Sequence, residues 1–587
     1  EIHKIYQVYQ QRCQKANAMD FDDLLVLTWR LFKENDDIRK KYAERFKYIL
    51  VDEYQDTNYV QQCIVLQLTM EQRHVCVVGD DAQSIYGFRG ANIDNILEFQ
   101  KIYPESRLFK LEQNYRSTQR IVQAANSLIR HNARQIPKDV FSHNDEGDKL
   151  IYKPVYSDKE EAVVVCRQIK HLRQKENGGY SDFAILYRTN SQSRSFEEEM
   201  LRQNIPYRIF GGMSFYQRKE IKDILAYFRM VANPDDEEAV KRIINYPARG
   251  IGNTTVAKIA ACAQLQGVSF WSVINSPVKY GLDVNNGVIG KLRSFAELIS
   301  SFIGRMPTTD AYELGKAIIK ESKISADIFG STDPDALSRQ ENIEELLSSL
   351  QAFVEERRET GRDEFTGLPD FLQEVSLLTD VESGDSNDGN KVSLMTIHAA
   401  KGLEFPTVFI VGMEENIFPN AMCLDNPREL EEERRLFYVA ITRAERHCIL
   451  TSAKNRWRFG KLEFGNPSRF LYEIDPRFMQ TDGDSPATER PFVRSAFKQE
   501  EQSPAIQTAH LRPIKVRQIS SPVSPAAPVT SAPDGLRVGS VIEHQRFGIG
   551  TVANLEGTGE NMKATVSFKN TGQKILLLKF ARYTIIG

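Results

Sequence analysis

An apolar run that ends in two acids is the first feature of the sequence able to do chemistry. Residues 48–58 read YILVDEYQDTN, so the run ends in Asp52 and Glu53. In an open parallel sheet, ligands bind beyond the carboxyl ends of the strands. A carboxylate there can hold Mg²⁺ on nucleotide phosphates, and its neighbour can polarise an attacking water. A strand ending in solvated acids explains Val-Asp-Glu alone about equally well, but the added Tyr-Gln-Asp-Thr makes the pattern more specific.

A second block combines phosphate-binding and base-stacking side chains. Residues 77–91 read VVGDDAQSIYGFRGA. Gln83 can donate to a phosphate oxygen and accept from a water. Tyr86, Phe88 and Arg89 place aromatic faces beside a cation, the combination that stacks bases and holds a nucleic-acid backbone. A core aromatic cluster with a capping glutamine is the structural alternative.

Three further segments place basic side chains among apolar ones. They read LEQNYRS at 111–117, VSLMTIHAAKGLEF at 392–405 and EEERRLFYVAITRA at 431–444. Taken alone, residues 431–435 are typical of a solvated helix face. His398 alone is more often a satisfied core residue than a ligand. These segments are informative only as a set.

The elements that position these residues follow from hydrophobic patterning. Short, mostly β-branched runs predict strands, with helical segments between them, at 48–51, 74–78, 183–187, 392–396 and 407–411. This pattern is typical of α/β domains with buried parallel strands. From about 215 to 385 the strand signals vanish, which predicts an all-helical insertion.

The C-terminal part of the sequence changes character twice. Residues 476–534 are rich in Ser, Pro, Ala, Gln and Thr, and cannot bury enough apolar surface to offset the entropy of ordering, so we expect a disordered linker. Apolar runs then return at 548–552, 564–568 and 574–578, with glycine turns. They predict a small β-barrel.

Composition excludes several classes of protein. The 587 residues carry a net charge of −3, so any nucleic-acid site must be a local groove rather than a global basic field. The seven cysteines show no C-x-x-C spacing, which argues against a zinc site or disulfide framework and favours a reducing cytosol. No apolar run approaches the roughly 18 residues of a membrane span.

Together, the five segments resemble the motifs of UvrD/PcrA/Rep superfamily 1 helicases. The resemblance covers nearly everything except 476–534. It implies two RecA-like P-loop NTPase domains that sandwich ATP. The implied first RecA-like domain is incomplete: it comprises residues 23–118, preceded at 1–22 by a remnant of its helical insertion. The second RecA-like domain comprises residues 119–214 and 386–475, and the duplex-facing helical insertion lies between them at 215–385. The linker at 476–534 and a Tudor/SH3-like barrel at 535–587 complete the chain.

The resemblance also assigns roles in ATP hydrolysis. Asp52 is expected to coordinate Mg²⁺, and Glu53 to lie at the metal and activate water. Gln83 is expected to sense the γ-phosphate. Arg116 and Arg443 are expected to reach the transferring phosphoryl group from either side of the cleft, where planar donors stabilise its charge.

The nucleotide and the nucleic acid have further expected contacts. Tyr115 is expected to stack on adenine and Glu404 to contact the ribose. On the DNA side the match points to Phe88, Arg89, His398 and Lys401, with Tyr86 beside them. These five residues are the expected contacts to single-stranded DNA. The family often has Trp where Phe88 stands, so stacking there is expected to be weaker.

Two regions outside the motor segments have implied partners. In the insertion, residues 246–255 read YPARGIGNTT, where Gly250 and Gly252 lead into a helix whose N–H groups can meet a DNA phosphate. A tight turn between packed helices is an equally good explanation from the residues alone; in the family this region faces duplex DNA and swivels. Residues 538–552 resemble the Tudor-like domain of bacterial PcrA and UvrD, which in the family docks on RNA polymerase.

One motif that the family needs does not occur in these residues. No G-x-x-x-x-G-K-[ST] loop is present, because Gly315-Lys316 is followed by Ala and Gly460-Lys461 by Leu. We expect the chain to start partway through the helical insertion of the first RecA-like domain. As written, it is expected to bind ATP poorly and hydrolyse it negligibly.

The resulting hypothesis is a bacterial ATP-dependent 3′–5′ DNA helicase of repair and replication. It is expected in the cytoplasm at the nucleoid, as a monomer or weak dimer acting on single strands and single/double-strand junctions. The alternative is a non-hydrolysing protein that binds DNA or RNA polymerase. Retention of Asp52, Glu53, Gln83, Arg116 and Arg443 favours the enzyme, since a pure binder has no use for that set.

Overall fold

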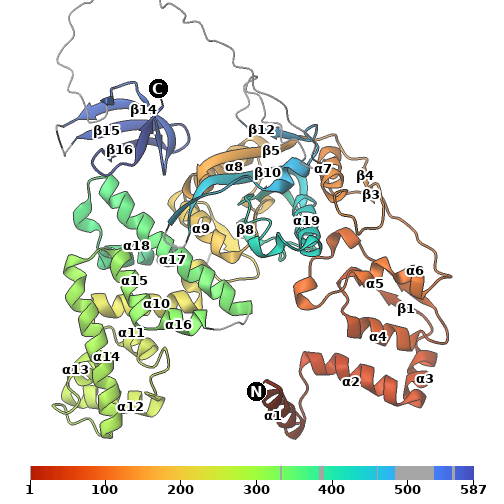
Figure 1. Ribbon diagram of the computed structural model, residues 1–587, viewed down its shortest axis with the longest axis horizontal. Coiled ribbons are helices and arrows are strands. Elements are labelled where there is room, and N and C mark those ends of the chain that lie inside the picture. The colour runs from red at the N-terminus through yellow and green to blue at the C-terminus, as the bar shows by residue number, and fades with distance from the viewer. Residues whose placement is uncertain are drawn as a thin grey trace, which may run out of the picture.

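The computed structural model describes residues 2–330, 334–382, 389–458, 461–482, 535–557, 559 and 562–586. Along these residues lie a small α/β unit, a large parallel sheet, an all-helical insertion and a C-terminal antiparallel sheet (Figure 1). The mixed α/β class that the sequence predicts is confirmed. None of the helices in the described residues is long and apolar enough to cross a membrane.

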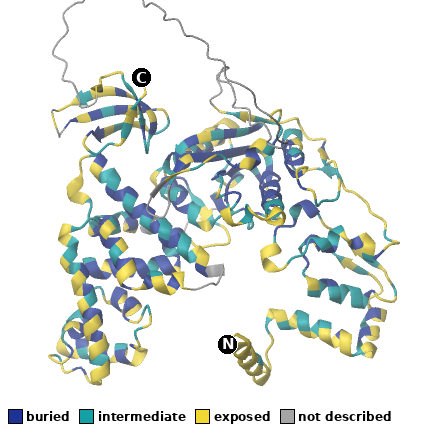
Figure 2. Ribbon diagram, in the orientation of Figure 1, coloured by how far each residue is buried: buried dark blue, intermediate teal, exposed yellow. Residues whose placement is uncertain are grey.

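The N-terminal α/β unit is built on two short parallel strands. Strands β1 (Ile49–Val51) and β2 (Val75–Val77) pair in register. Helices α2 (Phe21–Glu34), α3 (Asp36–Arg45), α4 (Tyr59–Leu68), α5 (Asp94–Leu97) and α6 (Phe99–Ile102) complete the unit. A capping box at Asp20 begins α2. Helix α1 (Ile2–Lys15) buries none of its residues and is largely exposed in Figure 2.

The large sheet has the strand order β12-β5-β10-β9-β6-β8-β7, with β11 beside β10. The strands are β5 (Leu150–Ser157), β6 (Phe183–Tyr187), β7 (Tyr207–Ile209), β8 (Val392–Thr396), β9 (Phe405–Ile410), β10 (Ala444–Arg458), β11 (Lys461–Phe464) and β12 (Met479–Thr481). All pairings are parallel except β10 with β11. Every residue of β6 is buried, which explains why its sequence is a continuous apolar run.

Strand β12 corrects one expectation from the sequence. It pairs with β5 at the edge of the large sheet, although it lies inside the range 476–534 that was predicted as linker. Three residues, Met-Gln-Thr, carry too little apolar signal to predict a strand, so the boundary at 475 is too early. The remainder of the predicted linker, 483–534, lies outside the described residues.

Helices cover both faces of the large sheet. Helices α7 (Gln119–Ile129), α19 (Pro427–Ile441) and α20 (Arg469–Glu473) share one apolar core with it, and α8 (Asp158–Glu176) and α9 (Ser193–Arg202) share the other. A two-residue ladder, β3 (Gln113–Asn114) with β4 (Phe141–Ser142), lies beside α7. The arrangement places the ends of several buried strands at one edge, where polar side chains can meet a ligand.

The insertion has an apolar core of its own. Its helices are α10 (Lys219–Ala232), α11 (Glu237–Ile243), α12 (Asn253–Gln266), α13 (Phe270–Asn275), α14 (Asn286–Arg305), α15 (Ala311–Glu321), α16 (Ile324–Phe329), α17 (Pro334–Glu359) and α18 (Leu368–Glu382). Between 215 and 382, the described residues contain no strand.

The C-terminal unit is a five-stranded antiparallel sheet. The strands are β13 (Val541–His544), β14 (Gly548–Glu556), β15 (Lys563–Phe568), β16 (Gly572–Leu577) and β17 (Tyr583–Ile585), in the order β16-β15-β14-β13-β17. Alternate residues of β15 are buried, as expected for a sheet with one face on a core. Figure 1 shows this sheet next to α17 and α18.

Candidate functional site

The acidic turn after β1 presents Asp52 and Glu53 at the surface. Glu53 has φ 48° and ψ 42°, a left-handed conformation that is uncommon for a residue with a side chain. This conformation begins the 3-10 turn η1 (Tyr54–Asp56), and the Glu53 N–H donates to Asp52 Oδ1 at 2.9 Å. Backbone strain of this kind clusters at functional sites.

A buried glutamine joins this turn to the one after β2. Gln55 Nε2 donates to Glu53 Oε2 at 2.5 Å, and Gln55 Oε1 accepts the Asp80 N–H at 3.0 Å. Gln83 Nε2 donates to Asp80 Oδ2 at 2.8 Å. A Cβ at Gly79 would lie 2.4 Å from Gln55 Oε1 and would displace that amide group. The structure therefore brings Asp52, Glu53 and Gln83 to one edge of the two-stranded sheet.

The acidic turn fits a metal ion that is shared with a nucleotide. Mg²⁺ is usually held by one or two carboxylates, with substrate phosphates and waters completing its shell. Asp52 and Glu53 are adjacent exposed carboxylates that suit such a site. Among the described residues, no cluster of three or more His, Cys, Asp or Glu could form a closed metal cage.

Lys401 connects the acidic turn to the large sheet. Its Nζ donates to the Asp56 carboxylate and, at 2.9 Å, to the carbonyl oxygen of Gln83; Glu53 Oε2 lies 3.6 Å away. The Lys401 side chain is 9% exposed, so the charge is largely removed from water. Burial raises the pKa of Asp56, and Lys401 opposes that rise. The sequence did not single out Asp56, although it stands within the first motif.

The predicted single-strand contacts gather in one cluster. The rings of Phe88 and His398 meet edge to face at 5.3 Å, and the Tyr86 hydroxyl donates to the His398 carbonyl oxygen at 3.3 Å. Lys401 Nζ lies 5.2 Å from the Tyr86 ring, and Arg89 lies over the rings of Tyr86 and Phe88. The five residues come from 86–89 and 398–401, so the cluster spans the seam between the two α/β units, and we call it the seam cluster.

The cluster combines an exposed ring with positive charge. Phe88 is 67% exposed and is free to stack on a base. The pKa of His398 is lowered to about 3 by burial and by the nearby Arg188 and Arg89, so the imidazole is neutral at physiological pH. Arg89 and Lys401 supply the cations of the cluster, and His398 contributes shape rather than charge.

A second group, which we call the arginine group, contains Arg116, Arg443, Tyr115 and Glu404. Arg116 Nε donates to Glu404 Oε2 at 2.6 Å, and its Nη1 donates to the Thr442 carbonyl oxygen at 3.2 Å. Arg443 is buried and donates to the carbonyl oxygens of Val439 and Leu403 at 3.1 Å each. Burial and the charge of Arg116 lower the pKa of Arg443 to about 10. Tyr115 is 77% exposed beside this group.

The two arginines do not approach from opposite sides, which corrects the expectation from the sequence. Ser117 Oγ donates to the Ala444 carbonyl oxygen at 2.6 Å, and the Thr118 N–H donates to that of Glu445 at 3.0 Å. These bonds attach the segment that carries Arg116 to strand β10. Arg116 and Arg443 therefore lie on the same side, that of the large sheet.

Helix α19 joins the two groups and adds residues that sequence reasoning missed. Glu432 Oε1 accepts the Gly87 N–H at 2.9 Å, and Arg435 Nε donates to the Ser84 carbonyl oxygen at 2.9 Å.

Lys138, which lies outside α19, is a further residue that sequence reasoning missed. Its Nζ donates to Asp80 and Asp81 at 2.5 Å each. No local signal in the sequence identifies these long-range pairs, apart from the charge density of 431–435.

The glycine turn of the insertion, with Gly250 and Gly252, is held by several hydrogen bonds but lies away from the seam cluster. Gly250 has φ +69°, and Lys291 Nζ donates to its carbonyl oxygen at 3.0 Å. Gly252 is the N-cap of α12, and Asn245 Oδ1 accepts the N–H groups of Arg249 and Ile251. Figure 1 shows α12 at the end of the insertion away from the large sheet. The structure does not bring this turn to the seam cluster.

Comparison with known proteins gives a consistent result along the chain. Residues 1–104 match the UvrD/REP helicase N-terminal domain, 109–455 the UvrD-like helicase C-terminal domain and 538–583 the PcrA/UvrD tudor domain. A protein of Leuconostoc citreum named ATP-dependent DNA helicase PcrA is 37% identical over 99% of this chain, and one of the same name from Bacillus subtilis (strain 168) is 39% identical over 99%. The aligned part spans 76% of each relative.

Proposed function

Because this chain belongs to the UvrD-like DNA helicase family, with a PcrA/UvrD tudor domain at its C-terminal end, we propose that it serves as an ATP-dependent 3′–5′ DNA helicase. The proposed substrate is single-stranded DNA and its junction with duplex, in repair and replication. The observation that carries the proposal is the seam cluster, in which Lys401 contacts both an aromatic ring and the acidic motif.

The seam cluster supports single-strand binding without base readout. Phe88 offers a ring for stacking, and Arg89 with Lys401 offers charge for phosphates. His398, neutral and packed edge to face on Phe88, fixes the orientation of that ring. Gly250 and Gly252, at the N-terminus of α12, are the proposed duplex contact.

The acidic turn and the arginine group support nucleotide chemistry. Asp52 with Glu53 would hold Mg²⁺, and the metal would supply charge neutralisation at the phosphates when bound. Glu53 polarises the attacking water and Gln83 senses the γ-phosphate. Arg116 and Arg443 stabilise the transferring charge from the large-sheet side, so hydrolysis requires the two α/β units to close on each other.

The base and sugar of ATP have proposed contacts beside Arg116. Tyr115 is exposed and can stack on adenine. Glu404 is bound to Arg116 in this structure and would exchange that partner for a ribose hydroxyl. Arg116 would thereby become free to reach a phosphate.

These 587 residues contain no G-x-x-x-x-G-K-[ST] sequence to cradle the phosphates. We propose that they bind DNA but, by themselves, turn over ATP negligibly. The alternative proposal is a non-hydrolysing DNA- or RNA-polymerase-binding protein, and the experiment below separates the two functions. The proposed partner of the C-terminal sheet is RNA polymerase, and the proposed location is the cytoplasm, at the nucleoid.

The experiment compares two forms of the protein. Binding of a labelled oligo(dT) is measured by fluorescence anisotropy for the 587-residue chain, and tight binding is expected. ATP turnover with and without oligo(dT) is then measured after joining the chain to the N-terminal part of a UvrD-like helicase that carries the phosphate-binding loop.

The outcomes separate the two functions. DNA-stimulated turnover in the joined protein, lost in Glu53→Gln with oligo(dT) binding kept, supports the helicase. Undiminished oligo(dT) binding with no turnover in the joined protein supports the non-hydrolysing binder. Absence of oligo(dT) binding contradicts both DNA-binding functions.

A further inference from the structure

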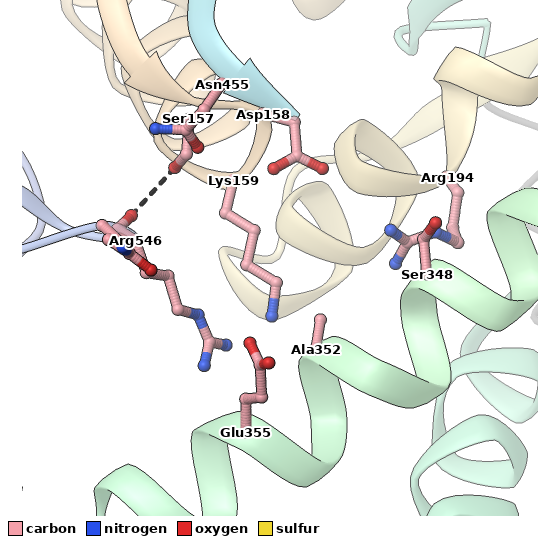
Figure 3. Close-up of a pocket in the computed structure, with 10 residues that line it drawn as sticks. Ser157, Asp158, Lys159, Arg194, Ser348, Ala352, Glu355, Asn455 and Arg546 are labelled. Carbon is pink, nitrogen blue, oxygen red and sulfur yellow. Dashed lines mark hydrogen bonds between the residues drawn. The ribbon is translucent and has the colours of Figure 1, made fainter. Parts of the chain in front are cut away.

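Three parts of the chain that are distant in sequence meet beside the C-terminal half of α17. They are the beginning of α8, helix α17 of the insertion, and the turn between β13 and β14 of the C-terminal sheet. Figure 3 shows Lys159 and Arg546 extending toward α17 from two different units, around a small polar cavity. None of these residues belongs to the seam cluster or the arginine group.

Arg546 is the centre of this junction. Its guanidinium pairs with Glu356 and lies 3.5 Å from Glu359, both on α17, and its side chain is 10% exposed. Lys159 Nζ, from α8, lies 3.3 Å from the same Glu356 carboxylate. The neighbouring His544 is fully buried, with Nε2 3.5 Å from Glu359. Glu356 of α17 is thus shared by cations from two other units, whereas Glu359 faces Arg546 and His544 of the C-terminal unit.

Arg546 and Glu359 are held largely out of water, whereas the Glu356 side chain is 40% exposed. Burial raises the pKa of Glu359 to about 7, whereas Arg546 and Lys159 hold the pKa of Glu356 well below its usual range although burial opposes them. A buried ion pair contributes little net stability, but loss of one partner leaves the other charge uncompensated. Removal of Arg546 therefore favours separation of the units, which returns the acids to water.

The same turn is also attached to the large sheet. Ser157 Oγ, at the end of β5, donates to the Arg546 carbonyl oxygen at 2.9 Å. From the turn between β15 and β16, Asn570 Nδ2 donates to Glu160 Oε1 of α8 at 2.8 Å. A Cβ at Gly548 would lie 3.2 Å from Tyr156 Cβ, so the backbones approach closely. The C-terminal sheet therefore contacts both the insertion and the large sheet at one place.

The insertion has its own core and only limited attachments to the large sheet. Its chain connections lie before α10 and after α18, and the N-terminal half of α17 is attached to α9 through Arg194, which donates to Glu345 at 2.6 Å. The opposite half of α17 meets Lys159 of α8 and Arg546 of the C-terminal sheet. That half is where a third unit can restrain rotation of the insertion.

We propose that the C-terminal sheet is a latch: by inserting Arg546 between the acids of α17 and the beginning of α8, it fixes the helical insertion in one orientation against the large sheet. When the latch opens, the C-terminal half of α17 is free. The insertion can then rotate about the attachment at the N-terminal half of α17. This role needs neither ATP nor DNA and does not depend on the proposed function.

The test is hydrogen–deuterium exchange with mass spectrometry on the intact 587-residue chain. Arg546→Ala is compared with Arg537→Ala, which removes an exposed arginine from the same unit. In Arg546→Ala, exchange is expected to rise on the order of tenfold or more in peptides covering 351–363 and 157–161. Peptides of β14 and β15 report whether the C-terminal sheet stays folded.

A second variant approaches the junction from the helix. Glu356→Ala is expected to increase exchange in the 545–548 turn. Protection of 351–363 that stays at the wild-type level in both single variants, with a folded C-terminal sheet, overturns the latch. If Arg546→Ala unfolds that sheet, Glu356→Ala decides the question.

Discussion

The Nζ of Lys401 donates to the carboxylate of Asp56, 345 residues earlier in the chain. This bond crosses the seam between the two α/β units, and both side chains are largely buried. Lys401 also lies 5.2 Å from the Tyr86 ring. One cation therefore contacts both the acidic motif and the seam cluster. A shift of either α/β unit would change the contacts of Lys401 in both places.

Loss of Lys401 should destabilise the seam. Lys401→Met leaves the Asp56 carboxylate without its counter-charge, and we expect a loss of about 3 kcal/mol in the free energy of unfolding. Asp56→Asn with Lys401→Met should recover most of that loss because no charge remains unpaired. Urea unfolding of the single and double variants measures the coupling, and additive losses would contradict it.

The same variant should be sensitive to pH. Lys401 opposes the rise in the pKa of Asp56 that burial causes, so its removal raises that pKa further. A carboxyl group whose folded pKa exceeds its unfolded value stabilises the folded state less as pH rises. The stability deficit of Lys401→Met relative to the wild type should therefore be smallest at low pH and grow as pH rises through the pKa of Asp56.

Phe88 should contribute a stacking platform for DNA. At fixed salt, Phe88→Ala should weaken oligo(dT) binding by about 1–3 kcal/mol, because one ring is lost from the cluster. Phe88→Trp should bind at least as tightly as the wild type. Phe109→Ala, a change at an aromatic residue that is 79% exposed outside the cluster, is the control. Equal anisotropy titrations for Phe88→Ala and the wild type would remove Phe88 from the site.

A methyl group at Gly87 should displace the turn that carries Phe88 and Arg89. The added Cβ would lie 2.4 Å from Glu432 Oε2, and the φ of Gly87 is not in the left-handed region, so the effect is steric. Gly87→Ala should weaken oligo(dT) binding several-fold. Adding Glu432→Ala to this variant removes the carboxylate that the new Cβ meets and should recover part of the lost affinity. Gly304→Ala, where a Cβ meets nothing within 4 Å, should bind as the wild type does.

The buried His398 should make stability fall in mild acid. Its folded pKa is about 3, below its ordinary value, so only the unfolded chain takes up a proton as pH falls through about 6.5. Stability should therefore fall by up to roughly 1.4 kcal/mol per pH unit between about 6.5 and 3. Urea unfolding at pH 7.5 and 5.5 should show a smaller change in His398→Gln than in the wild type. The exposed His143→Gln is the matched substitution control, and equal changes in all three proteins would refute the assignment.

The sequence predicts the buried strands well because their signal is local. The run at 183–187 becomes β6 and that at 392–396 becomes β8, each with the same bounds. A strand buried on both faces must be apolar throughout, and this requirement is visible without tertiary information. Strand β12, with three residues at a sheet edge, has no comparable requirement and was assigned to the linker.

The composition of the site was easier to predict than its geometry. Phe88, Arg89, His398 and Lys401 were expected to act together, and they form one cluster. The prediction that Arg116 approaches from the side opposite Arg443 was wrong. The position of Arg116 depends on hydrogen bonds from Ser117 and Thr118 to residues 444 and 445, more than three hundred positions later. Lys138 was missed for the same reason, since its partners are known only after folding.

Helix α19 carries both Glu432 and Arg435, which bind the segment after β2 through the Gly87 N–H and the Ser84 carbonyl oxygen. The two residues are three positions apart, about 300° around a helix at 3.6 residues per turn, so they occupy neighbouring positions on one face. One residue inserted between them would rotate Arg435 by about 100° relative to Glu432 and would leave only one of the two contacts in place. The segment that α19 binds therefore fixes the spacing of this pair along the helix.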